Sequence, residues 1–219
     1  MEVMRLPYEA DKEMSKKFWS KIKPEEYAFI TDKETMLKRY IEANGSIPQG
    51  TLYDVILKPS AYDYRDKEAI IDTFYGFERG KRRRKTFREL YDDVNTIILN
   101  LLDLGIEPGD LVSSVMGNVM EDAMIGYATA KLGAIYSFLY TAMPLGWFKE
   151  GLEQFLFDMK VCVLTPSLLP KGALDLFLEF KKTHPLLEHI FVVTKPDEPV
   201  PEGTAQFSRL LDRKIWGKY

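Results

Sequence analysis

The chain has 219 residues, enough for one large domain or for one domain with an extension. Apolar residues make up 46%, as in an ordinary globular protein, and 30 basic residues nearly balance 33 acidic ones. The resulting net charge of −3 gives no electrostatic basis for binding nucleic acid or an anionic membrane. The single cysteine, Cys162, excludes an internal disulfide framework, and the first residues lack the apolar segment of a secretory signal. We therefore expect a cytoplasmic protein with no membrane span and no nucleic-acid partner.

Residues 1–45 are rich in charge and predict a helical N-terminal extension. Thr31 and Glu34 have the spacing of a capping box, which would start a helix that ends near Gly45. Over residues 46–219 the pattern changes to alternating strand and helix signals. We therefore predict two parts, a helical extension and an α/β domain.

A β-hairpin is predicted near the start of the domain. Residues 69–77 (AIIDTFYGF) are rich in β-branched and aromatic side chains, and residues 82–87 form the returning strand. The connection contains a basic cluster made of Arg79 and residues 81–85. We interpret this cluster as a solvated hairpin turn, with a phosphate or nucleic-acid contact as the alternative, because no RNA-binding aromatic pattern accompanies it.

The clearest element is an amphipathic helix that follows the hairpin. Thr86 and Glu89 form a capping box at its start, and Gly105 suits the left-handed position after its end. The apolar residues on its single buried face are Leu90, Val94, Ile97, Ile98, Leu101 and Leu102. The Asp92-Asp93 pair falls on the polar face, where we expect solvated carboxylates rather than a catalytic pair.

A second strand and helix come next. Pro108-Gly109 suits the centre of a type II turn, and residues 111–116 predict a strand. Asn118 is predicted to cap the following helix, with Glu121 at its third position. The buried stripe of this helix is predicted to contain Ala123, Met124, Tyr127, Ala128 and Leu132.

The rest of the chain alternates strand and helix signals at short spacing. Strands are predicted over residues 135–140, 161–164 and 189–194, and helices over residues 147–158, 173–182 and 205–214. This alternation predicts the α/β class, with a mainly parallel sheet and helices on both faces.

Several side chains suggest a function, yet the sequence favours a structural role for each. Cys162 lies among apolar strand residues and is expected to be a buried packing residue. The only histidines, His184 and His189, share no metal-ligand spacing, so no metal site is predicted. Four aromatic residues are assigned to core packing, with an acyl pocket or a partner surface as alternatives: Phe138, Tyr140, Trp147 and Phe148.

Four segments, taken in order, resemble the motifs of adenylate-forming enzymes. Residues 86–90 (TFREL) resemble the family's T-Y-x-E-L opening, and residues 104–110 (LGIEPGD) resemble its L-G-(V/I)-x-x-G-D segment. Residues 118–121 match its N-x-x-E segment, although Gly117 stands where proline is usual. Residues 131–136 (KLGAIY) resemble its K-x-G-A-x-Y/H motif.

The whole pattern is similar to AMP-dependent acyl-CoA synthetases, particularly those that act on acetyl and medium-chain acyl groups. The resemblance implies the first subdomain of the adenylate-forming enzyme fold. In that family a carboxylate attacks ATP to give an acyl-adenylate and pyrophosphate, and CoA then displaces AMP. The complete enzyme would therefore use ATP, Mg²⁺ and CoA.

The family grips the triphosphate with a Ser/Thr/Gly-rich loop that ends in P-K-G, and this sequence contains no such loop. Residues 165–173 (TPSLLPKGA) contain P-K-G, but Leu168 and Leu169 stand where glycines would let phosphate approach the backbone. We interpret the segment as an ordinary strand-to-helix turn, with Pro170 in the first turn of the helix. The resemblance places Lys171 near a position where relatives carry an arginine close to the 3′-phosphate of CoA. Lys171 is thus a candidate ligand for that phosphate, or else a solvated surface lysine.

These observations predict the N-terminal portion or a subunit of an AMP-forming acyl-CoA synthetase that is inactive alone. We expect this chain alone to hold no catalytic residue, metal ligand or bound cofactor. Its partner would be a chain that carries the missing phosphate loop and C-terminal domain, or a second copy that covers exposed apolar surface. The alternative is a non-catalytic binding or scaffold protein that kept the fold and lost the chemistry.

Overall fold

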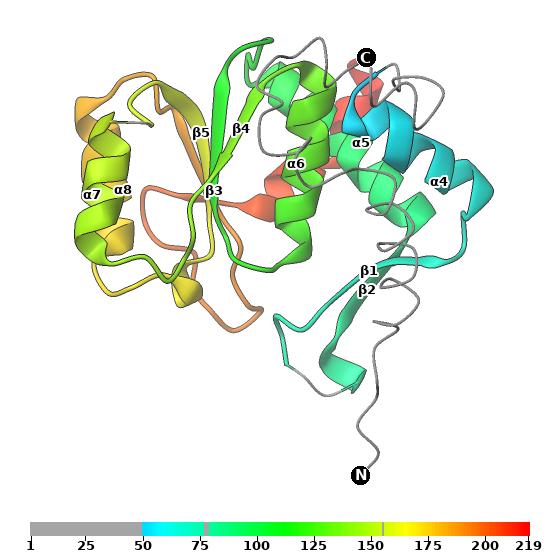
Figure 1. Ribbon diagram of the computed structural model, residues 1–219, viewed down its shortest axis with the longest axis horizontal. Coiled ribbons are helices and arrows are strands. Elements are labelled where there is room, and N and C mark those ends of the chain that lie inside the picture. The colour runs from blue at the N-terminus through cyan, green and yellow to red at the C-terminus, as the bar shows by residue number, and fades with distance from the viewer. Residues whose placement is uncertain (1–49, 77–78, 155) are drawn as a thin grey trace, which may run out of the picture. The chain divides into compact units, whose positions relative to one another are not determined.

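The computed structural model describes residues 50–76, 79–154 and 156–219 (Figure 1). These residues belong to one compact unit. The predicted extension over residues 1–45 lies outside the described residues, so its helical structure stays a prediction.

A five-stranded sheet forms the centre of this unit. Its strands are β3 (Leu111–Val115), β4 (Ile135–Phe138), β5 (Met159–Leu164), β6 (His189–Val192) and β7 (Ala205–Gln206). They lie in the order β4-β3-β5-β6-β7, and every neighbouring pair is parallel. The predicted α/β class with a parallel sheet is confirmed.

Helices cover both faces of the sheet, as predicted (Figure 1). One face carries α5 (Phe87–Asp103) and α6 (Met120–Leu132), and the other carries α7 (Leu145–Gln154) and α8 (Ala173–Thr183). None of the helices in the described ranges combines the length and the apolar character that crossing a membrane requires.

Both faces of β5 are buried, which is typical of an inner strand in a parallel sheet. Val161 and Val163 pack beneath α5 and α6, whereas Cys162 and Leu164 pack beneath α7 and α8. The Cys162 thiol is fully buried, and this burial raises its pKa. The prediction of a packing cysteine is confirmed, because a nucleophilic thiolate needs access and a lowered pKa.

The capping box at the start of α5 is present. The Thr86 hydroxyl accepts a hydrogen bond from the Glu89 N–H at 3.2 Å, and the Glu89 carboxylate accepts one from the Thr86 N–H at 2.8 Å. Gly105 follows the helix with a φ of +78°, which confirms the left-handed position. The predicted buried face wrongly includes Leu102, which is exposed. Leu102 lies about 120° around the helix axis from Leu90, at the margin of the apolar stripe.

Two short helical segments open the described chain. They are η1 (Tyr53–Leu57), which is π-helical, and α4 (Lys58–Asp63). The Lys131 ammonium pairs with the Asp54 carboxylate at 2.7 Å, so η1 is anchored to α6.

An antiparallel hairpin, β1 (Glu68–Asp72) and β2 (Arg83–Thr86), precedes α5 and is separate from the main sheet. The hairpin is confirmed, but the first strand predicted over residues 69–77 is too long. It ends at Asp72, whose carboxylate accepts a hydrogen bond from the Phe74 N–H at 3.2 Å. A local bond of this kind favours a turn over a continued strand.

The start of α6 differs from the prediction. The helix begins at Met120 with Val119 at the N-cap, and the exposed Asn118 makes no capping hydrogen bond. Glu121 is consequently the second helical residue and not the third. The Asp72 carboxylate of β1 takes the capping role, because it accepts a hydrogen bond from the Met120 N–H at 2.9 Å.

The buried face of α6 is wider than the predicted stripe. Met124 and Ala128 are buried as expected, and Ile125 and Thr129 are fully buried as well. This helix packs against α5 in addition to the sheet, so two of its sides are covered.

The helix predicted over residues 205–214 is wrong. The strand β7 is followed by two 3-10 helices, η4 (Phe207–Leu211) and η5 (Arg213–Gly217). This segment packs along α5, where the Trp216 indole N–H donates to the Thr96 hydroxyl at 3.0 Å. Tertiary contacts of this kind override the intrinsic helix propensity of a short segment.

Candidate functional site

The candidate site is the edge of the sheet where the parallel strands end at their carboxyl termini. From β3 the chain passes to β4 on one side of the sheet, and then to β5 on the other side of β3. Ligands of open α/β sheets bind outside the carboxyl ends of the strands at such a switch point. The loops that follow β3 and β5 are therefore the first place to look for a binding site.

Three loops converge tightly at this switch point. Gly117 follows β3 with a φ of +70°, a conformation that side chains rarely adopt. A Cβ atom on Gly117 would lie 3.1 Å from the Leu168 Cδ1 and 3.6 Å from the Thr141 Oγ1. The Leu168 side chain therefore occupies the space next to the β3 loop, where a phosphate loop would need open backbone.

The turn after β5 uses its own backbone N–H groups internally. The N–H groups of Leu168, Leu169 and Ala173 donate to the carbonyls of residues 165, 166 and 170 at 2.9, 3.2 and 3.0 Å. A phosphate cradle needs several adjacent N–H groups that are free to face an anion. The arrangement favours the ordinary turn over a degenerate phosphate loop.

The expected position of Pro170 is wrong. The turn contains the 3-10 helix η3 (Pro166–Leu168), and α8 starts only at Ala173. Gly172 precedes α8 as its N-cap with a φ of +86°. Pro170 therefore lies outside α8, two residues before the Gly172 N-cap and not in the first turn of the helix.

Lys171 lies in this turn, directly before the N-cap of α8. Its side chain is exposed, and no carboxylate of the described residues pairs with it. The Thr165 hydroxyl, at the start of the same turn, is buried and has no hydrogen-bond partner among the described residues. A free cation beside the positive end of a helix suits an anion, so a contact with the CoA phosphate stays a prediction.

The dominant polar feature near this edge is an ion network around Arg83. Its Nε donates to Asp72 at 2.9 Å, and its terminal nitrogens contact Glu121 at 2.5 and 2.8 Å as well as the second Asp72 oxygen. The rings of Phe74 and Tyr75 lie 5.2 and 4.9 Å from the guanidinium carbon. Arg83 thereby joins β2 to β1 and to the first turn of α6, and its plane is covered by aromatic rings.

The network keeps its charges despite burial. Burial alone would raise the pKa of Asp72, but hydrogen bonds from Arg83 and from the Met120 N–H hold it below its ordinary value of 3.8. Burial would likewise lower the pKa of Arg83, and the carboxylates of Asp72 and Glu121 raise it instead. Asp72 and Arg83 are therefore ionised at neutral pH.

The basic cluster of the hairpin was expected to be a solvated turn. This expectation is wrong for residues 83–85, which form ion pairs within the fold. Besides Arg83, Arg84 pairs with Glu68, and Lys85 pairs with Asp93 at 2.7 Å. Asp93 is buried, so its assignment to a solvated polar face is also wrong. Ion pairs within the fold occupy these cations, which leaves them poorly suited to a nucleic-acid contact.

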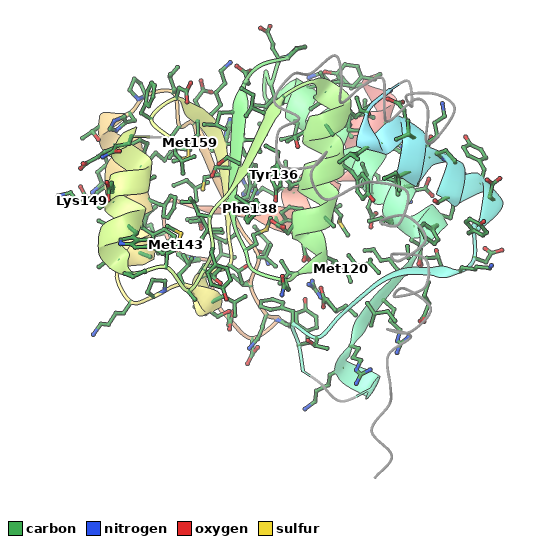
Figure 2. All side chains as sticks on the ribbon, in the orientation of Figure 1. Met120, Tyr136, Phe138, Met143, Lys149 and Met159 are labelled. Atoms are coloured by element: carbon green, nitrogen blue, oxygen red, sulfur yellow. The ribbon has the colours of Figure 1, made fainter. Side chains whose placement is uncertain are left out.

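A second buried polar cluster was not expected from the sequence. The Asp122 carboxylate accepts hydrogen bonds from the hydroxyls of Ser114 and Tyr136 at 2.7 and 2.5 Å. Tyr136 extends from β4 toward α6, where its ring passes over Gly126 (Figure 2). Burial, together with the Asp122 carboxylate, raises the pKa of Tyr136, so the phenol stays neutral. The K-x-G-A-x-Y/H motif contains Tyr136, but no spacing in it reveals the partner Asp122.

The four aromatic residues assigned to the core divide in two. Phe148 is fully buried against Phe177, with ring centroids 6.2 Å apart. Phe138, Tyr140 and Trp147 are 68, 66 and 62% exposed, which contradicts the assignment. Strand and helix signals mark these residues as apolar, but they do not reveal that β4 lies at the edge of the sheet.

The two histidines do not form a site. His184 stacks on Phe180 with centroids 3.6 Å apart, and His189 lies beside Glu188 at 3.8 Å. Within the described ranges, no group of three His, Cys, Asp or Glu residues is placed to hold a metal ion.

This fold is a doubly wound α/β sheet, and the partly exposed Leu168 side chain lies against the Gly117 loop at its switch point. The AMP-binding enzyme family matches residues 57–208, most of the chain, and the chain belongs to this family. The match spans the hairpin, the parallel sheet and all four covering helices.

Curated relatives are acyl-CoA ligases that are much longer than this chain. Medium-chain acyl-CoA ligase ACSF2, mitochondrial, of Danio rerio is 30% identical over 129 residues, which is 58% of this chain and 20% of that protein. Acetyl-coenzyme A synthetase of Salmonella typhi is 37% identical over 75 residues, 34% of this chain and 11% of that protein. The chain thus spans a fifth or less of the length of these two relatives.

Solved structures share the fold at low sequence identity. The anthranilate CoA ligase AuaEII, in complex with anthranoyl-AMP, has a TM-score of 0.59 at 23% identity and covers 75% of this chain and 28% of its own. Acetoacetyl-CoA synthetase from Streptomyces lividans has a TM-score of 0.61 at 20% identity and covers 74% of this chain and 25% of its own. These structures share the parallel-sheet architecture described above.

We predict that Arg83→Met strongly destabilises the fold. The change leaves two carboxylates without their cation while roughly preserving the volume of the side chain, and breaking a buried ion pair in this way costs about 3–5 kcal/mol. Equilibrium denaturation in urea measures the free energy of unfolding.

Arg84→Met on the same strand is the matched control. Its pair with Glu68 is partly exposed, so the expected loss is at most about 1 kcal/mol. Equal losses for the two variants would contradict a special role of Arg83.

Proposed function

We propose that residues 1–219 are the N-terminal portion or a subunit of an AMP-forming acyl-CoA synthetase. The complete enzyme would convert a carboxylate, ATP and CoA into acyl-CoA, AMP and pyrophosphate. The observation that carries this proposal is the family match over residues 57–208 on a doubly wound sheet. The names of the curated relatives, medium-chain acyl-CoA ligase and acetyl-coenzyme A synthetase, support a small or medium acyl substrate.

The division into an extension over residues 1–45 and a subdomain over residues 46–219 is part of the proposal, as is a cytoplasmic location. The family's ATP, Mg²⁺ and CoA would bind only in the complete enzyme. The groups that grip the triphosphate would come from a polypeptide that carries the phosphate loop and the C-terminal domain.

The geometry of the switch point supports inactivity of residues 1–219 alone. A triphosphate carries several negative charges and needs a loop of free N–H groups with Mg²⁺ or basic side chains. Three N–H groups of the turn after β5 are bonded within the turn, and the N–H of Met120 is bonded to Asp72. Arg83 is shared by the carboxylates of Asp72 and Glu121, so this cation is not free to bind a phosphate at the start of α6.

A second candidate is a non-catalytic scaffold. The observation that favours it is the close approach of Leu168 to the Gly117 loop at the switch point. A protein that has lost its chemistry would retain this packing even in the presence of the rest of the fold.

We expect purified residues 1–219 to release no pyrophosphate in an acid-dependent manner when supplied with ATP, Mg²⁺ and a panel of short and medium-chain carboxylates. Addition of a polypeptide that carries the phosphate loop and C-terminal domain should restore the release. Coupled measurement of pyrophosphate reports both results.

Pyrophosphate release by residues 1–219 alone would contradict the proposed inactivity. A complemented complex that forms but stays inactive would favour the scaffold over the synthetase.

Lys171 is proposed to contact the 3′-phosphate of CoA in the complemented enzyme. We expect Lys171→Ala to raise the KM for CoA about three- to tenfold, the effect of losing one partly exposed charge contact. The KM for 3′-dephospho-CoA should not change, because that analogue lacks the phosphate.

Lys149→Ala is the matched control, since Lys149 is an exposed lysine of α7 with no described partner (Figure 2). Equal effects of Lys171→Ala on CoA and on the dephospho analogue would exclude the phosphate contact.

A further inference from the structure

The strand β4 forms an open edge of the sheet. Among the residues that the structure describes, it pairs with β3 alone. The opposite edge is treated differently, because β7 has only two residues and leads directly into η4, whose Phe207 and Leu210 are buried. An unprotected edge offers a row of unpaired N–H and C=O groups to another strand.

The directions of the backbone groups on β4 can be derived from its pairing. The Ile135 N–H donates to the Asp110 carbonyl in the turn before β3, and the Leu139 N–H donates to the Ser114 carbonyl of β3, both at 2.8 Å. Because successive residues of a strand point to opposite sides, the N–H and C=O groups of Tyr136 and Phe138 point away from β3. These two residues supply the hydrogen bonds that the edge can make.

The side chains around this edge are apolar and uncharged. Phe138 on β4, Tyr140 after it and Trp147 in the first turn of α7 are each about two-thirds exposed. No charged residue occurs between Lys131 and Lys149. The edge therefore lacks the charges with which natural proteins prevent strands from pairing edge to edge.

We infer that a second copy of this chain occupies this edge, with the two β4 strands pairing antiparallel about a twofold axis at Ser137. This register places Tyr136 opposite Phe138 of the partner copy, so both outward-pointing residues form mutual hydrogen bonds. It also places Ser137 opposite the same residue, at a position without hydrogen bonds, where the strands approach most closely and a small side chain fits. Tyr136 and Phe138 share one face of the sheet, as their pairing with Val112 and Ser114 requires.

A second copy suits this edge better than a charged partner does. An uncharged strip neither repels its own copy nor selects a partner by charge. A twofold contact also stops at a dimer, because each copy offers one such edge and the contact pairs both of them.

The exposed apolar area at this edge sets the expected affinity of the dimer. Aromatic side chains bury on the order of 150–250 Å² each, so three rings that are two-thirds exposed supply roughly 300–500 Å² per copy. A standard stable interface takes about 800 Å² from each partner. The rings alone provide about half, so we expect a dissociation constant of about 1–100 μM.

Sedimentation equilibrium of the full chain tests the inference directly. We expect a concentration-dependent shift from 25.3 kDa to twice that mass across the micromolar range. Phe138→Lys and Trp147→Lys should each raise the dissociation constant about tenfold or more, because each buries a charge in the contact. Tyr62→Lys is the control, since Tyr62 on α4 is 62% exposed but far from β4 in the chain, and it should leave the constant unchanged.

Crosslinking tests the register. Cysteine at the twofold position, in Ser137→Cys, should form an intermolecular disulfide under mild oxidation, since Cα atoms about 4.5 Å apart fall within disulfide range. Ser167→Cys, in the exposed turn after β5, should not. A monomer at all concentrations, or a dimer that is insensitive to Phe138→Lys and not crosslinked through position 137, overturns the inference.

Discussion

The buried guanidinium of Arg83 is the interaction on which the described fold depends most. It is shared between Asp72 of β1 and Glu121 of α6, and two aromatic rings cover it. A buried cation of this kind is stable only when its hydrogen-bonding groups are satisfied, and two carboxylates achieve that here. The hairpin is thereby held at the start of α6, although it shares no strand pairing with the main sheet.

This network also determines what the carboxyl edge of the sheet can bind. Asp72, held by Arg83, accepts the Met120 N–H, which in many α/β proteins is free to face a ligand. The loops after β3 and β5 meet through Leu168 and Gly117. The proposed function accordingly assigns the groups that bind the polyanion to a part of the enzyme beyond the described residues. The chain spans a fifth or less of two curated relatives.

Local signals predicted most of the fold well. The capping box of Thr86 and Glu89, the glycine after α5 and the alternation of strands and helices depend on residues close together in the chain, and each was confirmed. The errors occur where distant residues decide. Asn118 has the right type and spacing for a cap, but Asp72, 48 positions before Met120, caps α6 instead. Likewise Phe138 and Tyr140 look like core residues because apolar patterns do not reveal which strand becomes the edge. For the candidate site, Lys171 stays a prediction, and the sequence did not reveal the Arg83 network, whose members come from β1, β2 and α6.

The most direct test of this account is an NMR titration of the Met120 amide from neutral to acidic pH. The hydrogen bond from this amide requires the ionised Asp72 carboxylate, whose pKa lies below its ordinary value of 3.8. A depressed pKa means that the folded protein keeps the charge until the pH falls through that lower value, so the amide resonance should shift with a midpoint below pH 3.8. A midpoint at or above 3.8, or a Met120 resonance that does not respond to acid before the chain unfolds, would contradict the account.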